Sequence, residues 1–202
     1  MTEVTLNNKL LRLQAVESVP EVNLYLCDTA HVLVQGQRYE CWPYAWVGGR
    51  ALARYILDNP QVVAGKTVVD LASGSGIVAI AAKLAGAARV VAVDDYLPSI
   101  QAIQLNADAN GVEIETVQQS VFDYTPSYGD LFVAGDPFYH EGLFGHLQSN
   151  FNPVLMGSPI RSDTWYHFYI TPDKIVETYR MQVPADYDDA TEYDAHVWWL
   201  SE

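Results

Sequence analysis

Residues 67–76 read TVVDLASGSG, a short β-branched run followed by a turn of small residues. A run of this length between small residues is typical of a buried strand that enters a tight turn. Apolar residues then recur at helical spacing from residue 77 to residue 84, and Gly86 stands where a helix would end in a left-handed cap. The stretch therefore predicts a strand, a glycine turn and a helix.

The same alternation continues along most of the chain. The predicted strands are 67–71, 90–94, 114–118, 131–135 and 154–156, and the predicted helices are 49–57, 77–84, 98–109 and 141–149. Strands that alternate with helices predict an α/β domain with a mostly parallel sheet covered on both faces. The acidic run 185–194 is interpreted as a solvated loop.

Composition limits the class of protein. A chain of 202 residues, half of them hydrophobic, is long enough for one sizeable core, so we expect a single domain over residues 1–202. A net charge of −14, from 11 Lys and Arg against 25 Asp and Glu, opposes binding to a phosphate backbone. We therefore expect no nucleic-acid partner. The same charge suits a basic partner, although a solvated acidic surface explains it equally well.

Targeting and metal signals are weak. The first residues, MTEVTLNNKL, lack the basic start and apolar run of a signal peptide, and no stretch approaches the ~20 apolar residues of a membrane helix. We expect a cytoplasmic protein with no membrane association. The two cysteines and five histidines have no metal-ligand spacing, so we expect no metal.

The glycine turn and a second acidic residue predict a cofactor site. A turn between a strand and a helix exposes backbone N–H groups and allows a ligand to approach the main chain. Asp94 ends the second strand of the pattern, where a carboxylate can accept hydrogen bonds from two ribose hydroxyls. Together these features indicate a cofactor that contains a nucleoside.

The spacing of the turn narrows the choice of cofactor. A dinucleotide site would show G-x-G-x-x-G, whereas the small residues here alternate as Ala72-x-Gly74-x-Gly76. Asp70, before the turn, can receive an ammonium group but would lie badly against a pyrophosphate. Both features favour S-adenosylmethionine.

From about residue 24 to residue 156, the chain resembles the seven-β-strand methyltransferases, and within them the group that contains the lysine methyltransferase of the electron transfer flavoprotein β subunit. The matching stretches are 45–60, the glycine turn, 105–107 and 135–139. The resemblance implies a Rossmann-like, doubly wound, seven-stranded sheet that is mostly parallel, with an antiparallel C-terminal hairpin. We expect residues 1–45 to be an N-terminal extension that helps to cover the substrate and cofactor pocket.

The resemblance also implies roles for individual residues. Trp46 walls the cofactor pocket, Asp70, Ala72, Gly74 and Gly76 hold the methionyl part, Asp94 holds the ribose, and Ser120 and Val121 face the adenine. Asp136 and Tyr139, in an Asp-x-x-Tyr arrangement, line the entry for the target amine. The implied activity is transfer of a methyl group to a lysine ε-amine of a protein substrate.

The chain departs from the family pattern at several positions. Ala72 stands where many members have glycine, and we expect a negative φ there. Tyr96 replaces a second acidic residue, for which Asp95 is the expected partial substitute in cofactor binding. Ser158 stands in a Gly-Ser-Pro turn that resembles a family Gly-Asp-Pro. These departures affect substrate specificity more than chemistry.

Three functions stay open at this point. The first is protein-lysine methylation, in which Asp136 and Tyr139 orient the amine in a desolvated pocket. The second is a small-molecule N-methyltransferase of the nicotinamide type, which would use the same cofactor residues but a closed aromatic pocket. The third is a catalytically silent S-adenosylmethionine-binding module that acts through partners.

Overall fold

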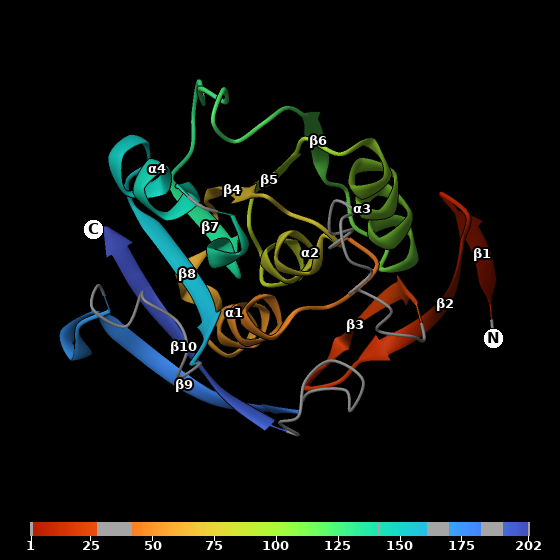
Figure 1. Ribbon diagram of the computed structural model, residues 1–202, viewed down its shortest axis with the longest axis horizontal. Helices are drawn as coiled ribbons and strands as arrows, with labels where there is room; N and C mark the ends of the chain where they lie inside the picture. Colours follow the sequence, from red (N-terminus) through yellow and green to blue (C-terminus); the bar gives the residue numbers. More distant parts are fainter. Residues whose placement is uncertain (1, 28–41, 141, 161–169, 183–191, 202) are drawn as a thin grey trace.

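A seven-stranded sheet forms the centre of the molecule, in the order β6-β5-β4-β7-β8-β10-β9 (Figure 1). The computed structural model describes residues 2–27, 42–140, 142–160, 170–182 and 192–201. The parallel strands are β4 (Thr67–Leu71), β5 (Arg89–Asp94), β6 (Glu115–Gln118), β7 (Leu131–Gly135) and β8 (Val154–Pro159). The strand β10 (Glu192–Ser201) runs antiparallel between β8 and β9 (Ile175–Gln182). The predicted mostly parallel sheet with an antiparallel C-terminal hairpin is confirmed.

Helices cover both faces of this sheet. The helices α1 (Val47–Asp58), α2 (Ile77–Leu84) and α3 (Leu97–Ala109) lie on one side, and α4 (Leu143–Asn150) lies on the other (Figure 1). Single 3₁₀ turns are η1 (Pro60–Val62), η2 (Pro137–Tyr139) and η4 (Pro172–Lys174). Gly86, with φ 94°, follows α2 in the predicted left-handed conformation. Among the described residues, no helix is long and apolar enough to cross a membrane.

Side chains alternate between the two faces of the buried strands, as strand geometry requires. In β4, Val68 packs toward α1 and α2, whereas Val69 joins the apolar cluster around α4. Val90 and Val91 divide in the same way in β5. Two apolar layers therefore cover the sheet, and its carboxyl-terminal strand ends meet at one edge.

The N-terminal residues form a second, smaller sheet that sequence patterning did not predict. It contains β1 (Glu3–Leu6), β2 (Lys9–Val16) and β3 (Val19–Leu26), paired antiparallel in that order. Asn7 and Asn8 have φ values of 47° and 61°, which is the geometry of a two-residue hairpin turn. Leu11 of this sheet packs with Ala102 of α3. The sheet therefore lies against the helix layer of the main domain.

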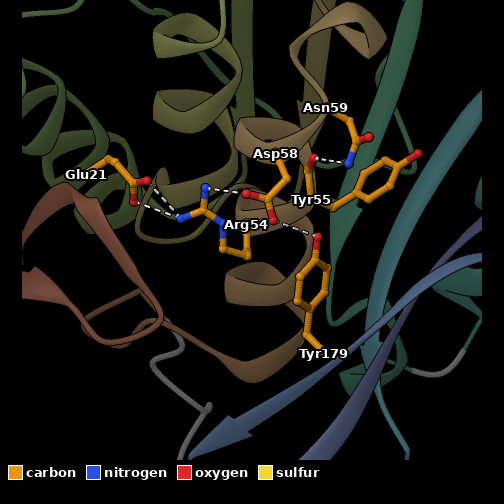
Figure 2. Close-up of polar contacts among 6 residues, drawn as sticks. All are labelled: Glu21, Arg54, Tyr55, Asp58, Asn59 and Tyr179. Carbon is orange, nitrogen blue, oxygen red and sulfur yellow. Dashed lines mark hydrogen bonds and ion pairs between the residues drawn. The ribbon is translucent and has the colours of Figure 1, made fainter.

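A polar network joins three elements around the C-terminal half of α1 (Figure 2). Arg54 binds both carboxylate oxygens of Glu21 in β3 at 2.9 Å and Asp58 one turn further along α1 at 2.7 Å. Tyr179 of β9 donates to the other oxygen of Asp58 at 3.0 Å. The network links the N-terminal sheet, α1 and the C-terminal hairpin.

The acidic run at 185–194 is only partly a loop. Residues 183–191 lie outside the described residues, but Glu192, Tyr193 and Asp194 begin β10 and pair with β9. Arg180 of β9 binds Glu192 at 2.7 Å and Asp194 at 3.3 Å across the strands. The interpretation of 192–194 as solvated loop was wrong, because a cross-strand arginine compensates the charge that suggested it.

Candidate functional site

The glycine turn between β4 and α2 depends on left-handed backbone conformations. Gly74 and Gly76 have φ values of 56° and 83°, which glycine adopts without a steric penalty. Ala72 also has a positive φ, 57°, so the expectation of a negative φ at this position was wrong. The N–H of Ser73, the residue after Ala72, donates to the carbonyl of Val93 in β5 at 3.0 Å. The turn holds its shape through contacts with the adjacent strand.

Asp70 lies beneath the turn and connects it to α2. Its side chain is 1% exposed, and Oδ2 accepts hydrogen bonds from Ser73 Oγ at 2.5 Å and from the N–H of Ala79 at 3.1 Å. Burial, with a smaller contribution from the nearby charge of Asp94, raises the pKa of Asp70 to about 7 despite the lowering effect of the two donors. Asp70 therefore fixes the junction between turn and helix, and the predicted contact with a methionyl ammonium stays a prediction.

Asp94 at the end of β5 lies directly beside the glycine turn. Its Oδ2 accepts from the N–H of Gly74 at 2.9 Å, and its Oδ1 accepts from the N–H of Tyr96 at 3.0 Å. Burial raises the pKa of Asp94, whereas these two bonds and Ser99 lower it. A Cβ built on Gly74 would meet no atom within 4 Å, so the turn has open space beside this carboxylate. The sequence-predicted pairing of the turn and Asp94 is thus present in three dimensions.

The remaining cofactor candidates lie on loops at the same strand ends. Ser120 and Val121 follow β6, and Ser120 Oγ accepts from the N–H of Phe122 at 3.3 Å. His146 Nε2 of α4 bonds to the carbonyl of Val121 at 3.0 Å and so fixes this loop. Asp95 is exposed next to Asp94. Trp46 precedes α1, with its ring 6.0 Å from that of Tyr44 in an edge-to-face arrangement.

Gly76 faces away from this space. A Cβ built there would lie 3.3 Å from a side-chain carbon of Ile103 in α3. Its glycine identity is therefore explained by its φ and by close packing between the turn and α3. Direct contact between Gly76 and a methionyl group stays a prediction.

Asp136, the residue predicted to line the entry for the target amine, holds the N-terminus of α1. Its Oδ2 accepts from the N–H of Gly49 at 2.8 Å, and its own N–H donates to the carbonyl of Gly157 at 2.8 Å. Its φ of 52° turns the chain sharply after β7. Burial raises the pKa of Asp136 to about 6, while the N–H groups of Gly48 and Gly49 and the charge of Arg50 lower it.

Glycines allow this close approach of α1 to the sheet. A Cβ on Gly48 would overlap the carbonyl oxygen of Gly157 and lie 2.8 Å from Asp136 Oδ2. A Cβ on Gly135 would lie 2.7 Å from Cα of Gly49. The sequence pattern predicted no function for these glycines. The Gly-Gly pair at a helix start was the available signal, because glycine is otherwise unfavourable inside a helix.

Around Asp136, the structure explains two further sequence features. Phe138 stacks on Phe144 and Trp198, with ring centroids 5.4 Å and 6.4 Å away, so it is a core aromatic. Ser158 accepts a hydrogen bond from Nε1 of the buried Trp198 at 3.1 Å, which accounts for the serine at this position. Residues 157–159 belong to β8 and pair with β10, so the interpretation of Gly-Ser-Pro as a turn was wrong. The backbone of Tyr139 ends η2, but its side chain lies outside the described part of the molecule, so its predicted role stays a prediction.

Comparison with known proteins identifies methyltransferases as relatives of this chain. The family model of ribosomal protein L11 methyltransferase (PrmA) matches residues 51–134. The electron transfer flavoprotein beta subunit lysine methyltransferase of Mus musculus is 38% identical over 176 residues, which cover 79% of this chain and 66% of the relative. The Caenorhabditis elegans homolog is 31% identical over 171 residues, which cover 70% of each chain. In the human enzyme of the same name, the match covers 55% of the length, so this chain spans about two thirds or less of these mammalian relatives.

Solved structures share the fold. The 16S rRNA N2 G1207 methyltransferase of T. thermophilus, in complex with AdoMet and guanosine, aligns with a TM-score of 0.55 and 16% identity over 98% of this chain and 49% of that chain. Trm5b from Pyrococcus abyssi aligns with a TM-score of 0.58 and 14% identity over 98% and 56% of the two chains. At this identity the likeness concerns the Rossmann-like fold.

Proposed function

The chain belongs to the family of electron transfer flavoprotein β-subunit lysine methyltransferases, and we propose that it transfers a methyl group from S-adenosylmethionine to a lysine ε-amine of a protein. One observation carries the cofactor half of the proposal. The carboxylate of Asp94 is held by the N–H of Gly74, next to open space above the glycine turn. A carboxylate and exposed main chain at adjoining strand ends are suited to a nucleoside cofactor.

The residues present fit S-adenosylmethionine. A carboxylate oxygen has more than one acceptor site, so Asp94 can bind ribose hydroxyls while it retains the N–H groups of Gly74 and Tyr96. When bound, the cofactor supplies a methyl group on a positively charged sulfur. We assign Asp70, Ala72, Gly74 and Gly76 to its methionyl side, Asp94 and Asp95 to the ribose, Ser120 and Val121 to the adenine, and Trp46 to the pocket wall.

Asp136 and Tyr139 are assigned to the acceptor amine. Asp136 is fixed by Gly49 and Gly157, and a pKa of about 6 leaves its carboxylate mostly ionised at neutral pH. An ionised carboxylate can hold and orient an amine without a large movement of its own. Removal of water from the amine when the acceptor docks would disfavour the ammonium form, and the neutral amine is the nucleophile that methyl transfer needs. Orientation and desolvation are therefore the contributions proposed for these residues.

We propose the electron transfer flavoprotein β subunit as the protein acceptor. The named relatives that share more than a third of their aligned residues with this chain act on that protein, as their names state. A net charge of −14 also favours encounter with a lysine-bearing, basic surface over encounter with nucleic acid. The charge supports a protein acceptor in general and the relatives support this particular one.

The test uses purified protein, methyl-labelled S-adenosylmethionine and the electron transfer flavoprotein β subunit. A portion of the acceptor is first acetylated to block its lysines, because an amide nitrogen cannot accept a methyl group, and Asp94→Ala serves as the enzyme control. We expect label on the untreated acceptor and none on the blocked acceptor or with the variant. Label only on small molecules from a cell extract would favour an N-methyltransferase of metabolites instead. Cofactor binding with no transfer to any acceptor would favour a silent binding module.

A further inference from the structure

Asn106 of α3 and Asn110, the residue that caps the C-terminus of this helix, cover the free edge of strand β3 in the N-terminal sheet. β3 is the edge strand of that sheet, with β2 on its other side. Asn106 Oδ1 accepts from the N–H of Tyr25 at 2.7 Å, and Asn110 Oδ1 accepts from the N–H of Asn23 at 2.9 Å. The two side chains lie one helical turn apart and so match alternate residues of the strand. They satisfy backbone groups that an edge strand otherwise leaves open.

Asn106 differs from Asn110 in what its other end binds. Asn106 Nδ2 donates to the carbonyl of Ser75 at 2.8 Å, inside the glycine turn. Asn110 Nδ2 instead donates to the carbonyl of Asn23 at 2.6 Å and to the carbonyl of Asn106 at 2.7 Å. Asn106 therefore joins β3 to the glycine turn, whereas Asn110 does not.

The orientation of the Asn106 amide is fixed by its partners. A backbone N–H can meet only the amide oxygen, and a backbone carbonyl can meet only the amide nitrogen. Asn106 is 0% exposed, so water cannot replace either partner. Its side chain acts as a rigid bridge of two hydrogen bonds between Tyr25 and Ser75.

Ser75 lies between the two glycines that give the turn its shape. Its carbonyl belongs to the same peptide as the N–H of Gly76, and its own N–H belongs to the peptide of Gly74. Because both glycines adopt positive φ and tolerate many other conformations, a glycine turn has little intrinsic preference for one shape. An external bond to Ser75 therefore selects one shape and lowers the entropy that a bound ligand would have to remove.

A second contact joins the N-terminal sheet to Asp94, the residue proposed to bind the ribose. Asn7, in the turn between β1 and β2, donates to the hydroxyl of Tyr96 at 3.0 Å. The N–H of Tyr96 donates to Asp94 Oδ1. The N-terminal sheet thus contacts the elements on both sides of the Gly74–Asp94 pair.

We propose that Asn106 is a positioning residue for the cofactor site, through which the N-terminal sheet keeps the glycine turn in its binding conformation. The inference rests on the proposed cofactor and gives the N-terminal extension a specific role, which is to preorganise the turn from behind. It implies that affinity for the adenosyl cofactor depends on residues that do not contact it.

Asn106→Asp and Asn110→Asp form a matched pair for the test. Each variant keeps an oxygen acceptor for β3 and loses an amide donor to a backbone carbonyl, but only Asn106→Asp releases Ser75. The alanine variants Asn106→Ala and Asn110→Ala repeat the comparison without a buried negative charge. Binding of S-adenosylhomocysteine is measured by calorimetry, and thermal unfolding is measured on the same samples.

We expect both pairs to unfold at lower temperature than the wild type. We expect the Asn106 variants to bind S-adenosylhomocysteine about tenfold more weakly, the effect of about one buried hydrogen bond, and the Asn110 variants to bind within about twofold of wild type. Wild-type affinity in a folded Asn106 variant, or an equal loss in both pairs, would overturn the inference. Failure of the wild type itself to bind would contradict the proposed cofactor and the inference with it.

Discussion

Asp94 ends the parallel strand β5 and Asp136 follows the parallel strand β7. Both carboxylates accept hydrogen bonds from backbone N–H groups, but the groups belong to segments at very different distances along the chain. Asp94 binds Gly74, 20 positions earlier, in the turn after the adjacent strand. Asp136 binds Gly49, 87 positions earlier, at the start of α1. The proposed cofactor end is therefore built within two neighbouring strand-turn units, whereas the proposed acceptor end depends on how a distant helix packs.

The proposed cofactor end and the proposed acceptor end also differ in whether they tolerate a side chain in place of glycine. A side chain on Gly74 would enter open space, whereas one on Gly48 would overlap Gly157 and crowd Asp136. The cofactor turn is constrained mainly by backbone conformation, and the acceptor end mainly by close packing. Four substitutions can test this contrast, beginning with the one expected to have the largest effect.

Gly48→Ala should nearly abolish methyl transfer. The new Cβ forces α1 away from Gly157 and Asp136, which releases the carboxylate and overpacks the junction. We expect a loss of about a thousandfold in kcat/KM and a destabilisation of about 3 kcal/mol. Gly145→Ala is the control, because Gly145 also lies in a helix but a Cβ there meets nothing within 4 Å. Near-normal transfer by Gly48→Ala would show that α1 does not position the acceptor end.

Asp94→Asn should weaken cofactor binding. The amide nitrogen of asparagine cannot accept the hydrogen bonds that a carboxylate oxygen accepts from N–H groups and hydroxyls. We therefore expect the affinity for S-adenosylhomocysteine, measured by calorimetry, to fall about a hundredfold. Asp108→Asn is the matched control and should lose less than about twofold, because Asp108 is an exposed residue of α3 with no assigned role in the site. A comparable loss of affinity in both variants would show that Asp94 does not make the proposed ribose contact.

Asp136→Asn should lower transfer while it leaves cofactor binding unchanged. The amide oxygen can still accept from Gly49, so α1 keeps its position, but the charge that orients the amine is lost. We expect kcat to fall about thirtyfold at saturating cofactor. Unimpaired kcat would limit Asp136 to a structural role at α1.

Asp70→Asn should change the pH dependence of stability. The folded-state pKa of about 7 exceeds the unfolded value, so the folded chain keeps a proton that the unfolded chain releases. The free energy of unfolding therefore falls as pH rises from about 4 to 7, by about 1 kcal/mol between pH 6 and pH 7. The variant should show a smaller slope in urea titrations, because Asp136, whose pKa is raised to about 6, keeps its own contribution. An equal slope in both proteins would assign the titration to another group.

The sequence predicted the main sheet well because its signals are local. The β-branched runs before Asp70 and Asp94 and the turn at 72–76 each combine strand propensity with a glycine break, and all lie where predicted. The N-terminal sheet was missed although the Asn7-Asn8 turn is a hairpin signal. Most residues of β1 and β2 are exposed or half-buried, so their apolar pattern is weak.

The candidate site also combines features that the local sequence predicts with features that depend on distant segments of the chain. The proximity of the glycine turn to Asp94 follows from two adjacent strand ends. Ala72 shows the limit, because an alanine in place of the family's glycine led us to expect a negative φ, whereas the structure has a φ of 57° there and ties the adjacent Ser73 to β5. The roles of Gly48, Gly157 and Asn106 depend on partners 31 to 109 positions away, and no local pattern contains that information.

The sequence alone determined the α/β class, the main strands and the position of the glycine turn, because propensity, periodicity and glycine placement act over a few neighbouring residues. Only the tertiary structure decided that Asp136 holds α1, that Asp70 is buried beneath the turn, and that Asn106 joins the turn to an N-terminal sheet. These contacts arise from packing between segments distant in the chain, where the burial of each polar group requires a partner that only the complete fold supplies.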